Sequence, residues 1–106
     1  MEINRFSVWL VNLDPTIGSE IRKTRPAVIV SPDELNAHLH TVIVVPLTTG
    51  RDYPFRVATT LQGTQGLAAI DQLRTVDKQR LIKRLGVIKA PVSERILQAL
   101  GAMFAP

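Results

Sequence analysis

The sequence predicts a small, mainly β domain (β with minor α): a curled antiparallel sheet or barrel with a short inserted helix and a C-terminal amphipathic helix. Short apolar runs alternate with turn residues along most of the chain. Near the end, the apolar spacing changes to that of a helix. A chain of 106 residues fits one domain, residues 1–106, which is large enough to enclose a hydrophobic core.

The composition excludes several classes of protein. Hydrophobic residues at 45% and charged residues at 21% are ordinary globular values, which argues against global disorder. Cysteine is absent, so disulfides and cysteine metal sites are excluded. Because no apolar run approaches about 18 residues and no signal peptide is visible, we expect a cytoplasmic protein without membrane contact. The net charge of +4 permits a nucleic-acid partner.

The first two strands flank a long loop. Residues 7–13, "SVWLVNL", are apolar and rich in strand-favouring types, and an Asp-Pro pair ends the run. The following loop extends to about Thr24, and loops of this length in small domains are often functional. Arg25 precedes Pro26, which can open a strand, and "AVIV" at 27–30 then reads as a buried strand.

A helix start follows the second strand. Ser31 is expected as the N-cap, Pro32 at the first helical position, and Glu34 as the partner that completes a capping box. The predicted helix is short and ends near His38.

Four further runs predict strands. Pro46, near the end of the first of them, indicates a sheet edge or a bulge. The runs are "TVIVVPL" (41–47), "FRVAT" (55–59), "LAAIDQL" (67–73) and "RLIKRLGVI" (80–88), with a glycine-bearing turn at 62–66.

The last segment predicts a helix. Pro91 stands at a tolerated start position, and Glu94 falls in the first turn, where the helix dipole favours an anion. The apolar residues recur at helical spacing: Val92, Ile96, Ala99, Leu100, Met103 and Phe104.

Several common sites are not present in the sequence. No phosphate-binding loop of the NTPase type occurs. His38 and His40 are the only histidines, and their spacing fits neither a helical metal pair nor a catalytic triad. We therefore expect no metal and no cofactor.

Three polar residues stand where predicted strands begin or end. Arg25 opens the second strand, Thr48 closes the third, and Asp71 follows Ile70 in the fifth. On one rim of a barrel they could converge, with arginine suited to phosphate oxygens, threonine donating a hydrogen bond and aspartate accepting a proton. The structural alternative is that Arg25 pairs with Asp71 or Glu20 and that Thr48 only ends its strand.

Positive charge gathers late in the chain. Between residues 74 and 95 there are seven Lys or Arg residues against two acidic ones. This pattern fits either a solvated basic face or the electrostatic footprint of a polyanion.

Three segments carry a family resemblance. "VWLVNLDPTIGSEIRKTRPAVIVS", "VVPLTTG" and "IDQLRTVDKQRL" strongly resemble the MazF/PemK/Kid toxins of bacterial toxin–antitoxin modules, from Arg5 to about Leu85. The resemblance implies an SH3-like antiparallel β-barrel, a homodimer, and sequence-specific, metal-independent cleavage of single-stranded RNA that inhibits translation and growth. It also implies a cognate antitoxin that lays a peptide segment across the RNA groove of the dimer.

The resemblance assigns roles residue by residue. Arg25 matches the arginine of the "TRP" motif and Thr48 the hydroxyl residue that ends "VVPLT". Asp71 resembles the catalytic base of Kid-like members, and Glu20, in "GSE", is the other candidate. The residues expected to contact RNA are Ser19, Glu20, Lys23, Thr49 and Gln72, within or near two base-reading loops, 16–24 and 49–53.

The chain departs from Kid-like members at three positions. Ser19 replaces a histidine and Ala69 replaces an arginine, so the roles of those residues are in question here. Phe6 replaces the glycine that usually precedes the first strand, which puts the local turn in question.

The chemistry that the resemblance implies is attack by a 2′-OH on the neighbouring phosphate, leaving a 2′,3′-cyclic phosphate and a 5′-OH. A rival reading is a CcdB-like toxin, which shares the barrel but binds DNA gyrase. Such toxins end in Trp-Gly-Ile, whereas this chain ends "AMFAP" and has its one tryptophan at Trp9. A non-catalytic nucleic-acid-binding barrel is the third possibility.

Overall fold

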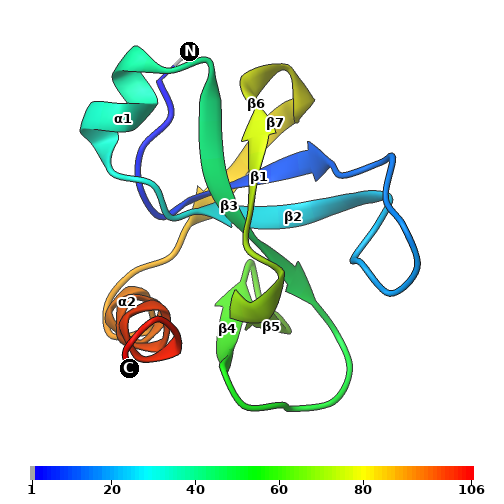
Figure 1. The fold of residues 1–106 in the computed structure, drawn as a ribbon, viewed down its shortest axis with the longest axis vertical. Helices are drawn as coiled ribbons and strands as arrows, with labels where there is room; N and C mark the ends of the chain where they lie inside the picture. Colours follow the sequence, from blue (N-terminus) through cyan, green and yellow to red (C-terminus); the bar gives the residue numbers. More distant parts are fainter. Residues whose placement is uncertain (1) are drawn as a thin grey trace.

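A computed structural model describes residues 2–106 as a curled, seven-stranded antiparallel sheet with two α-helices (Figure 1). The mainly β class, the short helix and the C-terminal helix are confirmed. The sheet order is β4-β5-β3-β2-β1-β7, and β6 also pairs with β3. The strands are β1 (Ser7–Asn12), β2 (Thr24–Ile29), β3 (Thr41–Thr48), β4 (Arg56–Leu61), β5 (Thr64–Ala69), β6 (Arg74–Asp77) and β7 (Leu81–Val87); the α-helices are α1 (Asp33–His38) and α2 (Val92–Met103), and the 3₁₀ turns are η1 (Ile70–Gln72) and η2 (Lys78–Arg80).

The second strand begins earlier than expected. β2 starts at Thr24 and pairs with β1, so that Arg25 lies opposite Val11 inside the ladder. β6 was not predicted, because only four residues pair and three of them are polar or charged. It pairs with the first half of β3.

β3 is the strand that joins the two parts of the sheet. Its residues 41–44 pair with β6, whereas Leu47 and Thr48 pair with β5. Pro46 lies between these two stretches and pairs with Ala27 of β2 on the other side. Of the two expected alternatives, the sheet edge is wrong, because β3 has neighbours on both sides. Pro46, which lacks an N–H, instead occupies an interruption of the ladder, where β3 changes partner from β6 to β5.

A tight hairpin joins β4 and β5 at one end of the sheet. Gln62 and Gly63 form a two-residue turn with φ of 50° and 80°, the backbone twist that suits antiparallel hairpins. The side chain of Gln62 donates from Nε2 to the carbonyl oxygen of Leu85 at 2.7 Å. A Cβ on Gly86 would lie 3.1 Å from Leu61, so the hairpin also packs closely against β7.

Ser31 does not cap α1, which corrects the expected capping box. The hydroxyl of Ser31 donates to Oδ1 of Asn36 at 2.6 Å and accepts from the Ile43 N–H at 3.0 Å. Pro32 takes the N-cap position, without a side-chain cap. The buried amide of Asn36 needs a partner and receives the hydroxyl, and this network ties α1 to β3.

The turn before β1 keeps a glycine-like conformation despite Phe6, whose φ is 70°. A side chain in this region costs about 1–2 kcal/mol. Two backbone hydrogen bonds hold it: the Phe6 N–H donates to Ile29 at 2.7 Å, and the Phe6 carbonyl accepts from Ile88 at 2.8 Å.

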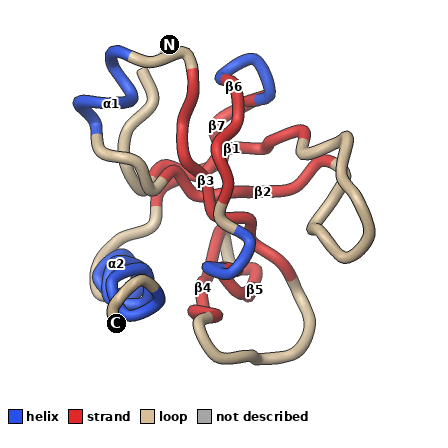
Figure 2. The backbone as a smooth tube through the Cα atoms, viewed as in Figure 1, coloured by secondary structure: helices blue, strands red, loops and turns tan. Residues whose placement is uncertain are grey.

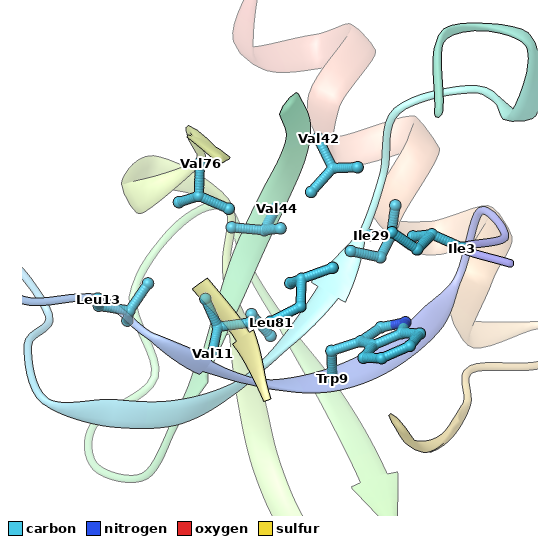
Figure 3. Packing of buried hydrophobic residues seen from close by; sticks show 10 residues of the cluster. Ile3, Trp9, Val11, Leu13, Ile29, Val42, Val44, Val76 and Leu81 are labelled. Atoms are coloured by element: carbon cyan, nitrogen blue, oxygen red, sulfur yellow. The ribbon is translucent and has the colours of Figure 1, made fainter. Parts of the chain in front are cut away.

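The core has two clusters of buried side chains. The first fills the sheet formed by β1, β2, β3, β6 and β7 and includes Trp9, Val11, Leu13, Ile29 and Val44 (Figure 3). The second lies beneath α2, where Ile96 is fully buried. Packing in both clusters fixes the positions of β2 and β3, whose ends carry Arg25 and Thr48.

The two long loops lie on one side of the molecule. The β1–β2 loop and the β3–β4 loop extend away from the side on which α1 and α2 lie (Figure 2). They follow the C-terminal ends of β1 and β3, so the start of β2 faces the same side. Among residues 2–106, no helix has the length and apolarity needed to cross a membrane.

Candidate active site

Arg25 and Thr48 come together because β2 and β3 are antiparallel. The register pairs Ala27 with Pro46. Arg25 lies two residues before Ala27, and Thr48 lies two residues after Pro46. Because the strands run in opposite directions, both residues lie at the same end of the ladder. Both line one hollow of about 300 Å³, together with Pro26, Leu47 and side chains of the β4–β5 hairpin.

The guanidinium of Arg25 is available to an anion. Arg25 is half-buried, and its Nε donates to the carbonyl oxygen of Arg22 at 3.2 Å. Throughout the described chain Arg25 makes no ion pair, so the alternative in which it is neutralised by Asp71 or Glu20 is wrong. The hydroxyl of Thr48 donates to the carbonyl oxygen of Thr49 at 3.1 Å.

Gly66 permits the close packing around Thr48. A Cβ on Gly66 would lie 3.2 Å from the backbone oxygen of Thr48, tighter than ordinary van der Waals contact. The absence of a side chain therefore lets β5 approach the end of β3.

Asp71 is held by an arginine that the sequence reasoning did not single out. It lies in η1, not in β5 as expected. Arg56 donates from Nε to Oδ1 at 3.0 Å and from Nη2 to Oδ2 at 3.1 Å. This fork lowers the pKa of Asp71 below its usual range and raises the pKa of Arg56.

The acidic candidates line a second hollow, of about 400 Å³, which contains Glu20, Asp71 and Gln72. Oε1 of Glu20 accepts from the Ile17 N–H at 2.6 Å, and Oε1 of Gln72 accepts from the Ile21 N–H at 3.3 Å. The structure thus brings the carboxylates together, but not into the hollow of Arg25 and Thr48. Consecutive residues of β3 link the two, since Pro46 lines the second hollow and Leu47 the first.

The remaining expected RNA contacts are exposed. Ser19 and Lys23 lie in the β1–β2 loop. The backbone of Lys23 is fixed: its N–H donates to Oδ1 of Asp14 at 3.1 Å, and its carbonyl accepts from Leu13 at 2.9 Å. Thr49 follows Thr48 directly.

The seven cations of the segment 74–95 divide into two groups. Three donate to backbone carbonyl oxygens, among them Lys78, which donates to Asn36. Arg74 donates to the carbonyl of Leu13 at 3.0 Å, and Arg80 donates to those of Asn12, at 3.2 Å, and Asp14. These arginines anchor the base of the β1–β2 loop. By contrast, four cations of the segment are exposed: Lys83, Arg84, Lys89 and Arg95.

Two of the exposed cations border a large hollow of about 810 Å³. Lys89 and Arg95 line it, and it shares Thr49, Thr59, Gln65 and Gly66 with the hollow of Arg25 and Thr48. The hollow of Arg25 and Thr48 therefore adjoins a wider hollow whose lining carries two positive charges, from Lys89 and Arg95, and one negative charge, from Asp52.

Sequence reasoning missed Arg56, and it gave Tyr53 no role beyond its place in the predicted base-reading loop, 49–53. The ring of Tyr53 lies over the Arg56 guanidinium, with Cζ 5.1 Å from the ring centroid. The available signal was the Gln62–Gly63 turn: a two-residue hairpin fixes the register and places Arg56 opposite Ala69, two residues before Asp71. In residues 2–106 there is no group of three or more histidine and carboxylate side chains placed to share a metal ion.

Comparisons with known proteins agree with this fold. A family model described as PemK-like, MazF-like toxin of type II toxin–antitoxin system matches residues 4–104. The chain is 36% identical to the endoribonuclease PemK of Escherichia coli over 109 residues, covering 96% of this chain and 82% of the relative.

Two solved structures are similar over nearly their whole length. MazF (Form-I) from Deinococcus radiodurans superposes with a TM-score of 0.86 at 25% identity, covering 97% of this chain and 96% of that one. An endoribonuclease in complex with its cognate antitoxin from Mycobacterial species gives a TM-score of 0.80 at 28% identity, with the same coverage.

These matches give the gyrase-binding alternative no support. The family model extends over nearly all of the chain, and the curated relative is more than one-third identical to it. The chain therefore belongs to the family of PemK-like, MazF-like toxins of type II toxin–antitoxin systems.

Proposed function

We propose that this protein is an endoribonuclease toxin that cleaves single-stranded messenger RNA at specific sequences and thereby inhibits translation and growth. The observation that carries the proposal is the pairing of Arg25 and Thr48 in one hollow, with Arg25 free of any carboxylate partner in residues 2–106. A fixed cation and a hydroxyl at a strand end suit a phosphodiester, because both can hydrogen-bond phosphoryl oxygens.

The proposed reaction uses the nucleophile of the RNA itself. The 2′ oxygen forms a bond to phosphorus, and the bond from phosphorus to the 5′ oxygen breaks. Arg25 stabilises the negative charge that develops on the phosphoryl oxygens, and Thr48 donates to one of them. Preorganised donors of this kind typically contribute about 10²–10³ in rate each.

Two proton transfers complete the reaction. A carboxylate, Asp71 or Glu20, accepts the proton of the 2′-OH, a step typically worth about 10²–10⁴. The departing 5′ oxygen takes up a proton, and Arg25 is the cationic group proposed to assist. The products are a 2′,3′-cyclic phosphate and a 5′-OH, and neither a water molecule nor a metal ion is consumed.

The substrate and partners follow from this reaction. RNA should be single-stranded, because its bases must be splayed out to be read. Ser19, Lys23, Thr49 and Gln72 are proposed to contact it from the two loops and η1. We further propose a cytoplasmic homodimer neutralised by a cognate antitoxin, in line with the solved relative that is bound to its antitoxin.

One assay tests the proposal. Purified protein is incubated with a long RNA in excess chelator, and the new ends are mapped. We expect discrete cuts with 5′-OH ends, and loss of cutting in folded Arg25→Ala and Thr48→Ala variants. Intact RNA in the wild-type reaction, or near-normal cutting by either variant, would refute it. A parallel binding measurement with DNA gyrase tests the alternative function, and we expect no binding.

A further inference from the structure

We propose that Arg56 is a positioning residue for Asp71, which it holds as the proton-accepting carboxylate of the cleavage reaction. This rests on the proposed endoribonuclease function and selects one of its two candidate bases. The geometry comes from three neighbouring segments: the β3–β4 loop supplies Tyr53, the start of β4 supplies Arg56, and η1 supplies Asp71.

The contact between Arg56 and Asp71 fixes the direction of the carboxylate. Two nearly parallel hydrogen bonds, of 3.0 and 3.1 Å, match the planar fork of the guanidinium to both oxygens. It is the one ion pair within residues 2–106. Each carboxylate oxygen keeps a further lone pair, so the group can still accept a proton.

Arg56 and Asp71 differ in their exposure to solvent. The Arg56 side chain is only 16% exposed, and the ring of Tyr53 covers its guanidinium, whereas the Asp71 side chain is 40% exposed. An anchored cation behind an accessible carboxylate is the arrangement expected of a fixed base. Glu20, in contrast, lies on an exposed loop, where one of its oxygens accepts a backbone N–H.

The groups that face Asp71 come from several elements. Arg56 contacts it from β4, while Glu20 of the β1–β2 loop and Arg74 of β6 line the same hollow. The side-chain hydrogen bond from Arg56 is the largest cause of the lowered pKa of Asp71. In the reaction this keeps the carboxylate ionised, and therefore able to accept a proton, down to more acidic pH.

The test is the pH profile of cleavage. Arg56→Met keeps an unbranched, uncharged side-chain stem and removes the fork, and we expect about 10-fold to 100-fold slower cleavage at neutral pH because the base is no longer oriented. The acid limb of the profile should also move to higher pH. Arg56→Lys restores the charge and should return the limb toward its wild-type position. Arg56→Gln replaces the Met variant if that one does not fold.

Two controls separate positioning from stability. Asp71→Asn should remove the acid limb, and combining it with Arg56→Met should be no worse than Asp71→Asn alone. Lys83→Met removes the same unit charge from β7, where it makes no ion pair with any residue of 2–106, and should leave the limb in place.

Three results would overturn the inference: an unmoved limb in Arg56→Met, full activity in Asp71→Asn, or additive losses in the double variant. These three results bear on Arg56 only if the wild-type protein cuts RNA and the Arg25→Ala variant does not. Failure of the endoribonuclease function is therefore distinguishable from failure of the Arg56 assignment.

Discussion

Thr48 is a single side chain whose hydroxyl can be tested apart from its shape. It ends β3 and lines the hollow of Arg25. Thr48→Val keeps the branched shape and loses the donor, so we expect cleavage to fall by about 10²–10³. Thr48→Ser keeps the hydroxyl and should cleave within a few-fold of wild type. Single-turnover rates on one oligonucleotide measure both, and equal rates for the Val and Ser variants would contradict the role of the hydroxyl.

Asp71 also makes stability depend on pH. Because its pKa in the folded protein is lowered by Arg56, the pair stabilises the fold above the ordinary aspartate pKa of about 3.9, and this contribution is lost as the pH falls through the folded value. At neutral pH Asp71→Asn should cost at most about 1 kcal/mol, since the carboxylate is partly exposed.

The pH dependence is measured by denaturant unfolding of wild type and variant between neutral and acidic pH. The difference in unfolding free energy should shrink below about pH 4. Arg56→Met should give the same curve, because either substitution removes the same pair. A difference that stays constant on acidification would contradict this account.

Site residues can be predicted from the sequence where a polar side chain suited to the reaction stands at the end of an apolar run. Arg25 and Thr48 were singled out because each stands at the end of an apolar run, and the ladder does bring them together. Arg56 was not, because its partner is fixed by a register that no residue type reveals until the hairpin turn is located. The predicted N-cap role of Ser31 is wrong because its hydroxyl donates to the buried side chain of Asn36, five residues later.

Among the elements, β5 and α2 offer a matched pair of glycines. Gly66 lies against the backbone of Thr48, whereas Gly101 in α2 has open space around its Cβ position. Gly66→Ala should force β5 away from the end of β3 and lower both cleavage and stability. Gly101→Ala should raise the unfolding free energy by up to about 1 kcal/mol, because alanine favours a helix, and should leave cleavage unchanged.

Thermal melts and cleavage rates on the two glycine variants check this prediction. If Gly66→Ala cleaves as fast as Gly101→Ala, the close approach of β5 to Thr48 has no bearing on the site.

Helices and strands whose apolar residues follow a regular spacing can be predicted from the sequence, whereas elements without such a spacing cannot. The helical spacing after Pro91 located α2, and the apolar runs located β1 and β3. β6 was missed because three of its four residues are polar or charged, so only its pairing with β3 makes it a strand. The sequence predicts a strand at η1 because the apolar residues around it continue the run from β5.

At the scale of the whole molecule, the distribution of charge predicts a salt dependence. Lys89 and Arg95 are exposed at the large hollow that adjoins the hollow of Arg25. Contacts between these cations and phosphates should make RNA binding weaken steeply with salt, by a slope of about 0.7 per neutralised phosphate for single strands. Replacing both with Gln should lower that slope by about 1.4 and raise KM more than it lowers kcat.

Binding of a non-cleavable oligonucleotide at several salt concentrations measures the slope. Replacing Lys83 and Arg84 with Gln is the matched control on β7, outside that hollow. An unchanged slope in the Lys89 and Arg95 double variant would place the RNA elsewhere on the surface.

The pairing of β2 with β3, and not the length of the chain between them, determines how Arg25 and Thr48 are placed. Twenty-two residues lie between Arg25 and Thr48, including α1, yet the register of two short strands alone sets their spacing. Insertions after α1, at residues 39–40 and on the opposite side from the loops, leave both strands and the Ser31–Asn36 contact in place, and should not change the gap between cation and alcohol. Relatives could therefore diverge freely in this segment, and a reporter tag grafted there should spare the toxic activity.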